Sequence, residues 1–412
     1  MQASDVDVPF LASESWDARM PERMRWLREN DPVHWSEQDR LWLLSRYRDV
    51  VFASKHQEIF SSAEGVRPGS SVKIGLIDEA EPRHGHLRRL LGRGFTPRMV
   101  RRLELAFESI VARAIDAVAR TGECDFVEDI AVPLPLQMIA SMIGIRPEDW
   151  GRFHRWSDAM ILADGREDEP DVIRKAGAAY MEYAAYVTAI IEDRRRHPQG
   201  DLVSILTGAK DGGLLREYRE TPELYDADSA DDMQLANDEL IKLLVIMLVA
   251  GNETTRNALS GGMQLLIENP GERKKLIQDP SLIPAAVEEM VRLVSPVHSF
   301  SRTVVENVEL GDTKLEQGQR VLLLYPSANR DESVFEDADC FRVERNPAHV
   351  GFGIGSHFCL GANLARMEMR VAFRELLRRL PDMEYSEGGP QIEPAALVRA
   401  CTRMRVRFTP EP

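Results

Sequence analysis

One loop near the C-terminus constrains the fold of this chain more than any other segment. Residues 352–361, FGIGSHFCLG, place Cys359 among glycines and directly before a run that favours a helix, residues 362–368. The glycines let backbone amides approach the sulfur, and the positive end of the following helix favours an anionic sulfur there. We therefore expect the pKa of the Cys359 thiol to be lowered, so that the sulfur acts as a metal ligand or a nucleophile. A buried cysteine in a tight turn is the alternative.

Length alone would suggest two or three domains, but the absence of a linker or repeat makes one large domain plausible. The chain has 412 residues with no linker or internal repeat, and its hydrophobic content of 43% is ample for a large core. A formal charge of −15 argues against nucleic acid as a partner. We find no apolar run of the ~18 residues that a membrane span needs and no signal peptide at the N-terminus, and we expect a cytoplasmic protein. The four cysteines lack paired spacing, so neither a disulfide scaffold nor an iron–sulfur cluster is indicated.

Helical periodicity dominates the chain, and strand patterns are confined to a few short segments, which predicts a mainly α fold with small β-sheets. The strand patterns are at 32–35, 41–44, 320–324 and 404–408, and the clearest helical patterns are at 100–119, 133–143, 147–162, 172–196, 237–269 and 360–380. The helix over 237–269 begins at a good N-cap, Asn237, and at 1.5 Å per residue it spans roughly 50 Å. Because it is apolar nearly all round from Leu243 to Ala250, we expect it to be buried and central. Residues 216–232 are polar and acidic and predict a solvated surface loop.

An acid and an alcohol, Glu253 and Thr254, interrupt the apolar part of this long helix. Burying them costs free energy unless each finds a partner. Ala250 and Gly251 precede Thr254 by four and three residues on the same face, which leaves a shallow gap beside the hydroxyl. A hydrogen bond from Thr254 to the Ala250 carbonyl would bend the helix there. A threonine that merely marks a helix kink is the alternative.

These motifs resemble those of the cytochromes P450. The loop at 352–361 matches the haem-thiolate loop of that family at every fixed position, and the string at 250–255, AGNETT, resembles the acid–alcohol pair of its monooxygenases. The resemblance runs from about residue 30 to the end. It implies a single P450 domain over 1–412, with about 1–30 as an N-terminal extension and about 150–200 as mobile lid helices.

The resemblance also implies the cofactor and the residues that hold it. The cofactor is haem b with Cys359 as the axial iron ligand. Thr254 and Glu253 would be catalytic, the hydroxyl assisting dioxygen activation and the carboxylate relaying protons. The implied haem contacts are His84, Arg88, Arg302 and His357 for the propionates, together with Ala250, Gly251, Phe352, Gly353 and Gly361. We expect the two other histidines that we considered, His86 and His349, to be surface cations.

Glu289 and Arg292 stand at i and i+3, where they can pair on one helix face. The surrounding segment, 286–296, is similar to the ExxR helix of the P450 family, in which the pair is structural. We assign both residues a folding role. Phe341, Arg342 and Arg345 resemble the segment whose arginine completes that network, and the sequence leaves open which of the two arginines does so.

An arginine-rich run stands out against the acidic chain. Residues 82–103 hold seven arginines and no acid, which suits the docking of an acidic partner. The P450 resemblance places this run on the cysteine side, where a ferredoxin would bind. The residues of the predicted docking face are Arg89, Arg93, Arg98, Arg101 and Arg102. A merely solvated helix face is the alternative.

The resemblance implies a haem-thiolate monooxygenase that inserts one atom of O₂ into a C–H bond of a sterol-, terpenoid- or fatty-acid-like substrate, with electrons from NAD(P)H through a ferredoxin and its reductase. The substrate pocket would be lined by Ile246, Val249, Val297, His298 and Phe300 and closed by residues near 60–76 and 160–162. One rival is a peroxygenase driven by hydrogen peroxide, against which Glu253 and Thr254 argue. A second rival is a haem-binding sensor without turnover.

Overall fold

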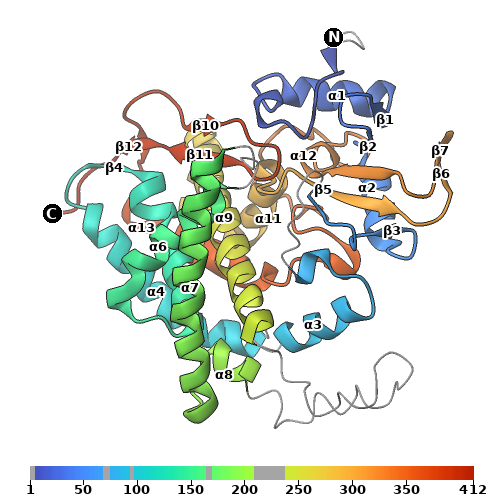
Figure 1. The fold of residues 1–412 in the computed structure, drawn as a ribbon. Helices are drawn as coiled ribbons and strands as arrows, with labels where there is room; N and C mark the ends of the chain where they lie inside the picture. Colours follow the sequence, from blue (N-terminus) through green and yellow to red (C-terminus); the bar gives the residue numbers. More distant parts are fainter. Residues whose placement is uncertain (1–4, 68–74, 93–96, 164–168, 208–236) are drawn as a thin grey trace.

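The computed structural model describes residues 5–67, 75–92, 97–163, 169–207 and 237–412 (Figure 1). As predicted, helices dominate. The α-helices are α1 Met20–Asn30, α2 Tyr47–Lys55, α3 Arg83–Gly92, α4 Pro97–Val118, α5 Pro133–Ile143, α6 Trp150–Leu162, α7 Pro170–Arg196, α8 Leu202–Thr207, α9 Asn237–Glu268, α10 Pro270–Gln278, α11 Ile283–Val294, α12 Tyr325–Ala328 and α13 Ala362–Arg379. The predicted acidic loop at 216–232 lies outside the described residues.

The strands form small sheets beside the helices. They are β1 Val33–Ser36, β2 Leu41–Leu44, β3 Phe60–Ser61, β4 Glu123–Asp125, β5 Ser299–Val304, β6 Val308–Leu310, β7 Thr313–Leu315, β8 Arg320–Leu324, β9 Glu384–Tyr385, β10 Gln391–Glu393, β11 Ala400–Arg403 and β12 Arg405–Arg407. The largest sheet has the order β1-β2-β8-β5-β3, with β2 and β8 parallel and the other neighbours antiparallel. Near the C-terminus, β12 pairs with both β4 and β9, and β10 pairs with β11.

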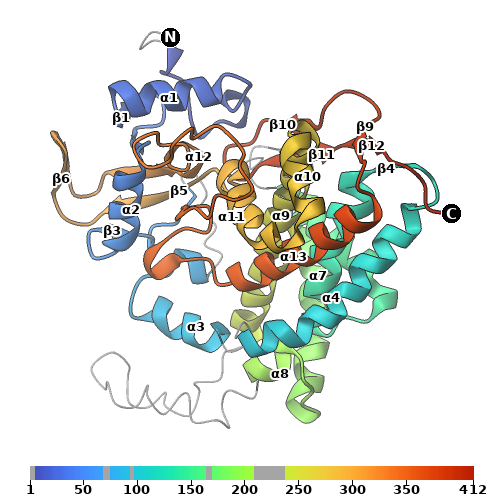
Figure 2. The ribbon, with the colours of Figure 1, turned by 180° about the vertical axis from the view of Figure 1, so that it is seen from behind.

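The helix predicted over 237–269 is α9, which has 32 residues and passes through the middle of the helical lobe in both views (Figures 1 and 2). It ends before Asn269-Pro270, where the proline cannot continue a helix already under way. In Figure 2, the view from behind, α13 passes in front of this helix. Side chains of α4, α5, α9, α11 and α13 share one buried core. The segment that carries Cys359 leads directly into α13, so this core fixes where the cysteine lies.

One expectation about apolar segments is wrong. Residues Phe126–Ile143 form a helical stretch that is long and apolar enough to cross a membrane, which the sequence analysis missed. However, 72% of this stretch is buried inside the protein. Its side chains, such as Phe126, Ile130 and Leu134, pack into the core that α9 and α13 share, and this packing explains the apolar composition.

The N-terminal residues pack closely against the rest of the protein. The indole of Trp16 stacks on His298, with ring centroids 4.5 Å apart. Arg28 in α1 is buried and donates to Glu332 at 2.8 and 3.1 Å. The described residues before position 30 therefore pack as part of the domain. They are an extension only in the sense that they come first in the sequence.

Candidate functional site

The loop around Cys359 is closed by backbone hydrogen bonds that need its glycines. The Cys359 N–H donates to the Phe352 carbonyl at 2.8 Å, which folds residues 352–359 back on themselves. Gly353 and Gly355 have φ values of 67° and 80°, a region that side chains disfavour. A Cβ on Gly355 would also collide with the carbonyl of Ser54 in α2. The loop therefore takes this shape only with glycine at both positions.

The pKa of the Cys359 thiol differs from the expected one. Burial raises it, although the N–H groups of Gly361 and Ala362 and the guanidinium groups of Arg88 and Arg366 act to lower it. The helix terminus does stabilise the anion as predicted, but the loss of solvent is the larger effect. A thiolate here needs a metal ion, because a coordinating thiol is deprotonated by the metal itself.

The structure brings His84 and His357 together beside the cysteine loop. Their rings stack at 3.9 Å between centroids. Ser62 donates to the Glu79 carbonyl at 3.0 Å, so its hydroxyl oxygen accepts from Nε2 of His357 at 3.2 Å. This hydrogen bonding assigns the Nε2–H tautomer to His357, and burial lowers its pKa to about 2, so Nδ1 is an acceptor. Nε2 of His357 is thus engaged by Ser62, and the propionate contact expected for His357 stays a prediction.

His84 has the complementary arrangement. It is buried, Nδ1 lies 2.9 Å from Oε1 of Glu81, and Nε2 has no hydrogen-bond partner. Glu81 was missed by the sequence analysis, although its i, i+3 spacing from His84 was a usable signal. The carboxylate orients the ring and leaves Nε2 available to a further group.

Two arginines complete this cluster. Arg302 in β5 is buried with one hydrogen bond, from Nη1 to the Ser301 carbonyl at 2.7 Å, and within the described part of the chain Asp78 acts on it electrostatically without a direct ion pair. Arg88 in α3 donates to the Phe358 carbonyl next to the cysteine. Burial lowers the pKa of both guanidinium groups. A buried arginine without a counter-ion is costly, and an anionic ligand between these side chains would remove that cost.

The acid–alcohol turn lies on α9 as predicted. The Thr254 hydroxyl donates to the Ala250 carbonyl at 2.6 Å, which is the predicted back-bond. Ala250 is exposed although it stands in the middle of a core helix, and Thr254 is half-buried. Gly251 serves a different purpose from the one expected. A Cβ on it would lie 2.8 Å from Cδ1 of Ile139 in α5, so the glycine allows the two helices to approach closely.

Glu253 is buried and held by its own helix. Its Oε1 accepts from Arg256 Nη2 at 2.7 Å and from Asn257 Nδ2 at 2.8 Å, whereas Oε2 has no partner. Burial raises the pKa of Glu253 despite the opposing effect of Arg256 and Asn257. Asn257 also accepts from the Cys401 N–H of β11 at 2.9 Å. The carboxylate is therefore fixed beside a network that the sequence did not reveal.

Two asparagines, Asn252 and Asn257, connect the acid–alcohol turn to other elements of the fold. Asn252, fully buried, donates to the Ser157 hydroxyl of α6 at 3.0 Å. Asn257 links the turn to β11, which follows the segment that contacts Val297 through a bridge at Val398. The turn is thus tied to α6 on one side and to the C-terminal strands on the other.

Most of the predicted pocket residues lie on the expected elements. Ile246 is buried and lies near Gly75, while Val249, Val297 and Phe300 are half-buried. His298 does not fit the expectation. Its ring stacks on Trp16, its Nδ1 lies 2.8 Å from the Ala395 carbonyl, and burial lowers its pKa to about 4. These contacts give His298 a structural role. Parts of the predicted lid, residues 68–74 and the side chains of 161 and 162, lie outside the description.

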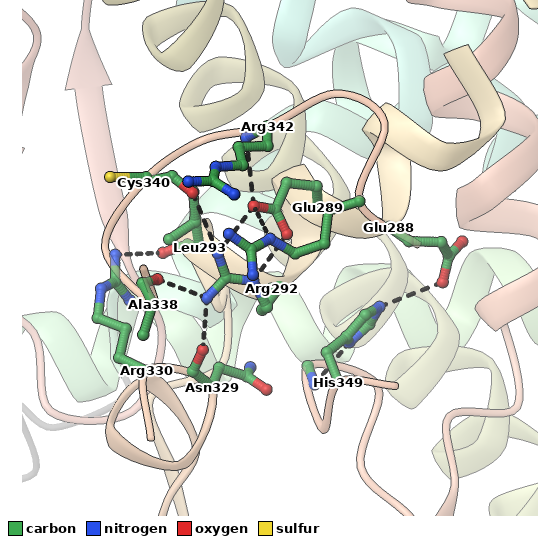
Figure 3. Close-up of polar contacts among 12 residues, drawn as sticks. Glu288, Glu289, Arg292, Leu293, Asn329, Arg330, Ala338, Cys340, Arg342 and His349 are labelled. Atoms are coloured by element: carbon green, nitrogen blue, oxygen red, sulfur yellow. Dashed lines mark hydrogen bonds and ion pairs between the residues drawn. The ribbon is translucent and has the colours of Figure 1, made fainter. Parts of the chain in front are cut away.

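The structural pair Glu289 and Arg292 forms as predicted, with both side chains fully buried (Figure 3). Arg292 also donates to the carbonyls of Asn329 at 2.7 Å and Ala338 at 2.6 Å. Arg345 completes the network, because its Nε donates to Glu289 at 2.9 Å. Arg342 contributes only its backbone N–H, at 3.3 Å, and its side chain pairs with Asp337.

The prediction for His349 is wrong. Its side chain is 3% exposed, and Nε2 lies 3.2 Å from Glu288 Oε2. Figure 3 shows the two side chains joined by this contact. Glu288 also binds Arg366. The side chain of His86 lies outside the described residues.

Within the arginine-rich run, Arg89 and Arg101 are exposed. Arg83 pairs with Glu79 and Glu239, and Arg88 points into the cysteine loop. Arg93 and the side chains of Arg98 and Arg102 lie outside the description. The described part of the predicted docking face is therefore narrower than the sequence run.

These residues fit a haem. One cysteine sulfur is surrounded by N–H donors, and Arg302, Arg88 and the unpartnered Nε2 of His84 supply the donors that two propionates require. The described residues contain no group of three or more His, Cys, Asp or Glu side chains able to hold a metal ion. The fold and the site define a haem protein with a cysteine-bearing ligand loop.

Comparison with known proteins agrees. The family model "Cytochrome P450" matches residues 170–395. Steroid C26-monooxygenase of Mycobacterium tuberculosis is 36% identical over 100% of this chain and 99% of its own length. Methyl-branched lipid omega-hydroxylase of the same organism is 39% identical over 87% of this chain and 80% of its own length. This chain belongs to the cytochrome P450 family, whose cofactor is haem b.

Solved structures give the same result for the fold. CYP109Q5 from Chondromyces apiculatus has a TM-score of 0.83 at 30% identity, covering 99% of both chains. CYP109E1 from Bacillus megaterium, solved in complex with testosterone, has a TM-score of 0.80 at 30% identity, covering 94% of this chain and 98% of its own. The predicted P450 fold is confirmed.

Proposed function

We propose that this protein is a monooxygenase in which Cys359 ligates haem iron and Thr254 and Glu253 manage protons. The observation that carries the proposal is the closed cysteine loop, in a chain of this family, beside donors that could bind carboxylates: Arg88, Arg302 and the unpartnered Nε2 of His84. A haem held by a cysteine thiolate supplies the reduction and cleavage of dioxygen. One oxygen atom enters a substrate C–H bond and the other leaves as water, which consumes two electrons and two protons.

Two side chains of α9, Thr254 and Glu253, have different roles in the proposed proton transfer. The Thr254 hydroxyl, now bonded to the Ala250 carbonyl, is the donor nearest the exposed face of the helix. Burial raises the pKa of Glu253, and its Oε2 has no partner, so the carboxyl group is suited to take up a proton and pass it on when Arg256 and Asn257 let it turn. Thr254→Ala should lower product formation on the order of 100-fold, with the electrons diverted to hydrogen peroxide.

The substrate is proposed to be a hydrophobic molecule with a branched aliphatic end. Two relatives are named for steroid C26 oxidation and for omega-hydroxylation of a methyl-branched lipid. The predicted pocket side chains Ile246, Val249, Val297 and Phe300 are apolar and suit such a group. Helices α6 and α7 would form the mobile lid.

Electrons are proposed to come from NAD(P)H through a ferredoxin and its reductase, in the cytoplasm. The exposed Arg89 and Arg101 are the described part of the docking face, and they would attract an acidic ferredoxin. Charge reversal at both positions should slow reduction of the haem and weaken its dependence on salt.

The assignment of Cys359 as the iron ligand is tested by spectroscopy of the ferrous–CO complex. Wild-type protein and Cys340→Ser should show the red-shifted Soret band of thiolate ligation, whereas Cys359→Ser should lose it. Cys340 is a matched control because it is an exposed free cysteine. An unchanged band in Cys359→Ser would refute the assignment.

The substrate is tested by Soret titration followed by product analysis. A sterol with an intact aliphatic side chain and a methyl-branched fatty acid should shift the Soret band and be hydroxylated at a terminal methyl group. A sterol nucleus without the side chain is the control. Turnover with hydrogen peroxide alone, equal to that with NAD(P)H, ferredoxin and reductase, would instead support the peroxygenase, and haem binding without turnover would support the sensor.

A further inference from the structure

Helix α11 carries two adjacent glutamates with separate partners, and only Glu289 belongs to the buried scaffold network. Glu288 lies apart from that network in Figure 3. Its Oε1 accepts from Nε of Arg366 and its Oε2 from Nη2, both at 2.7 Å, which makes a bidentate pair with α13. Its Oε2 also lies 3.2 Å from Nε2 of His349.

The hydrogen bonding fixes the proton positions in this group. The Gly351 N–H donates to Nδ1 of His349 at 3.0 Å, so Nε2 carries the proton and donates to Glu288. Burial acts to raise the pKa of Glu288, but the hydrogen bonds from His349 and Arg366 outweigh it and lower the pKa to about 2. Glu288 is therefore ionised at neutral pH and holds both partners.

Arg366 and His349 in turn hold the ring of Phe352, the first residue of the cysteine loop. The guanidinium carbon of Arg366 lies 4.6 Å from the ring centroid, and the His349 ring lies 5.6 Å from it at an angle of 44°. The Phe352 carbonyl accepts the Cys359 N–H. The contacts thus run from Glu288 through two side chains to the residue that closes the loop.

The backbone at Gly351, next to Phe352, is packed tightly against α11. A Cβ on Gly351 would lie 2.9 Å from the Val291 carbonyl of α11 and 2.8 Å from its Cγ1. The loop therefore packs directly on the helix that carries Glu288. A shift of the Phe352 ring has to come from its side-chain partners, because the backbone beside it is held.

We propose that Glu288, Arg366 and His349 form a clamp that positions Phe352 and so tunes the sulfur of Cys359. The proposal rests on the proposed ligation of haem by Cys359. Ligand basicity in metal sites depends on outer partners and on the access of water to the ligand. A released Phe352 ring would admit water to the sulfur, and hydrogen bonds from that water would weaken the thiolate as a donor and raise the reduction potential.

The clamp borders an open pocket, which supplies a matched control. This pocket of about 380 Å³ is lined by Glu288, Arg366 and Arg370, among others. Arg370 is on α13 one turn after Arg366, is half-buried, and has no hydrogen bond or ion pair within the described part of the protein. Arg370→Met therefore removes the same charge from the same pocket without touching Phe352.

The test measures the ferric–ferrous midpoint potential of the full-length, haem-loaded protein by spectroelectrochemistry. The variants are Glu288→Gln, Arg366→Met, their double variant, Phe352→Leu and Arg370→Met. If only charge mattered, Glu288→Gln would raise the potential and Arg366→Met would lower it. The clamp predicts that both raise it, because both release the ring.

Each clamp variant should change the reduction equilibrium at least threefold, which is about 28 mV for a one-electron couple at 59 mV per tenfold change. The double variant leaves the net charge of the protein unchanged, and its midpoint potential should also be raised. Phe352→Leu should also raise the potential, and adding Arg366→Met to it should change little more. Arg370→Met should not raise the potential.

The proposal is overturned if Glu288→Gln and Arg366→Met shift the midpoint potential in opposite directions. It is also overturned if Phe352→Leu shifts the potential and neither clamp variant does. If Glu288→Gln fails to take up haem, Arg366→Lys decides, because it keeps the charge and loses the planar contact with the ring. Absence of the thiolate-type ferrous–CO band in wild-type protein would instead overturn the ligation itself. The two failures are therefore distinguishable.

Discussion

Replacing Arg345 by glutamine should cost the protein about 2–4 kcal/mol of unfolding free energy, and the same change at Arg342 less than about 1 kcal/mol. Arg345 donates to the fully buried carboxylate of Glu289 at 2.9 Å and to the Glu336 carbonyl at 2.8 Å. A charge-assisted bond to a buried carboxylate contributes about 1.5–3 kcal/mol and a neutral one about 0.5–1.5 kcal/mol. Arg342 forms only a half-exposed pair with Asp337, and such pairs contribute little.

The assay is guanidinium unfolding followed by far-ultraviolet circular dichroism, on samples of equal haem content. The two arginines lie three residues apart in one segment, so each variant is the control for the other. Equal loss of stability in both, or a larger loss in Arg342→Gln, would show that the buried carboxylate does not depend on Arg345 and would refute the reasoning.

Three further outcomes are expected. Gly355→Ala should prevent the cysteine loop from closing, because a Cβ there meets the α2 backbone at a positive φ, and haem retention after gel filtration measures this. Burial raises the pKa of Glu368 from 4.5 to about 8, so the folded state keeps a proton that the unfolded state loses; stability should fall as pH rises from 4.5 to 8, and Glu368→Gln should abolish that fall in urea midpoints. Asn257→Ala leaves the Cys401 N–H without a partner and removes one of the two hydrogen bonds to Oε1 of Glu253, which should cost about 2–3 kcal/mol in the same denaturation assay.

Local patterns predicted the elements that carry the site. The glycine spacing around Cys359 and the apolar run of α9 are patterns among residues that are close in the sequence. Such local patterns can be recognised without knowing the fold. Strand β5 was missed, because its buried Ser299, Ser301 and Arg302 break the apolar alternation that marks a strand.

Contacts between distant elements could not be predicted. His349 looks like any polar residue in a loop, and its burial depends on Glu288, 61 positions earlier. The choice between Arg342 and Arg345 depends on how an irregular segment turns its side chains toward α11. The lowered pKa expected for Cys359 was wrong because helix-end charge can be read from sequence, whereas the depth of burial cannot.

The hydrogen bond from the Asn252 side-chain amide to the Ser157 hydroxyl has a practical consequence for altering this protein. Because α6 holds Asn252, the residue next to Glu253, changes to α6 that are meant only to admit a bulkier molecule should also displace the turn to which we assign the proposed proton transfer. Substrate range and the fraction of electrons wasted as peroxide would then vary together. Libraries that hold Ser157 and Asn252 constant while varying the remaining α6 side chains should separate the two traits.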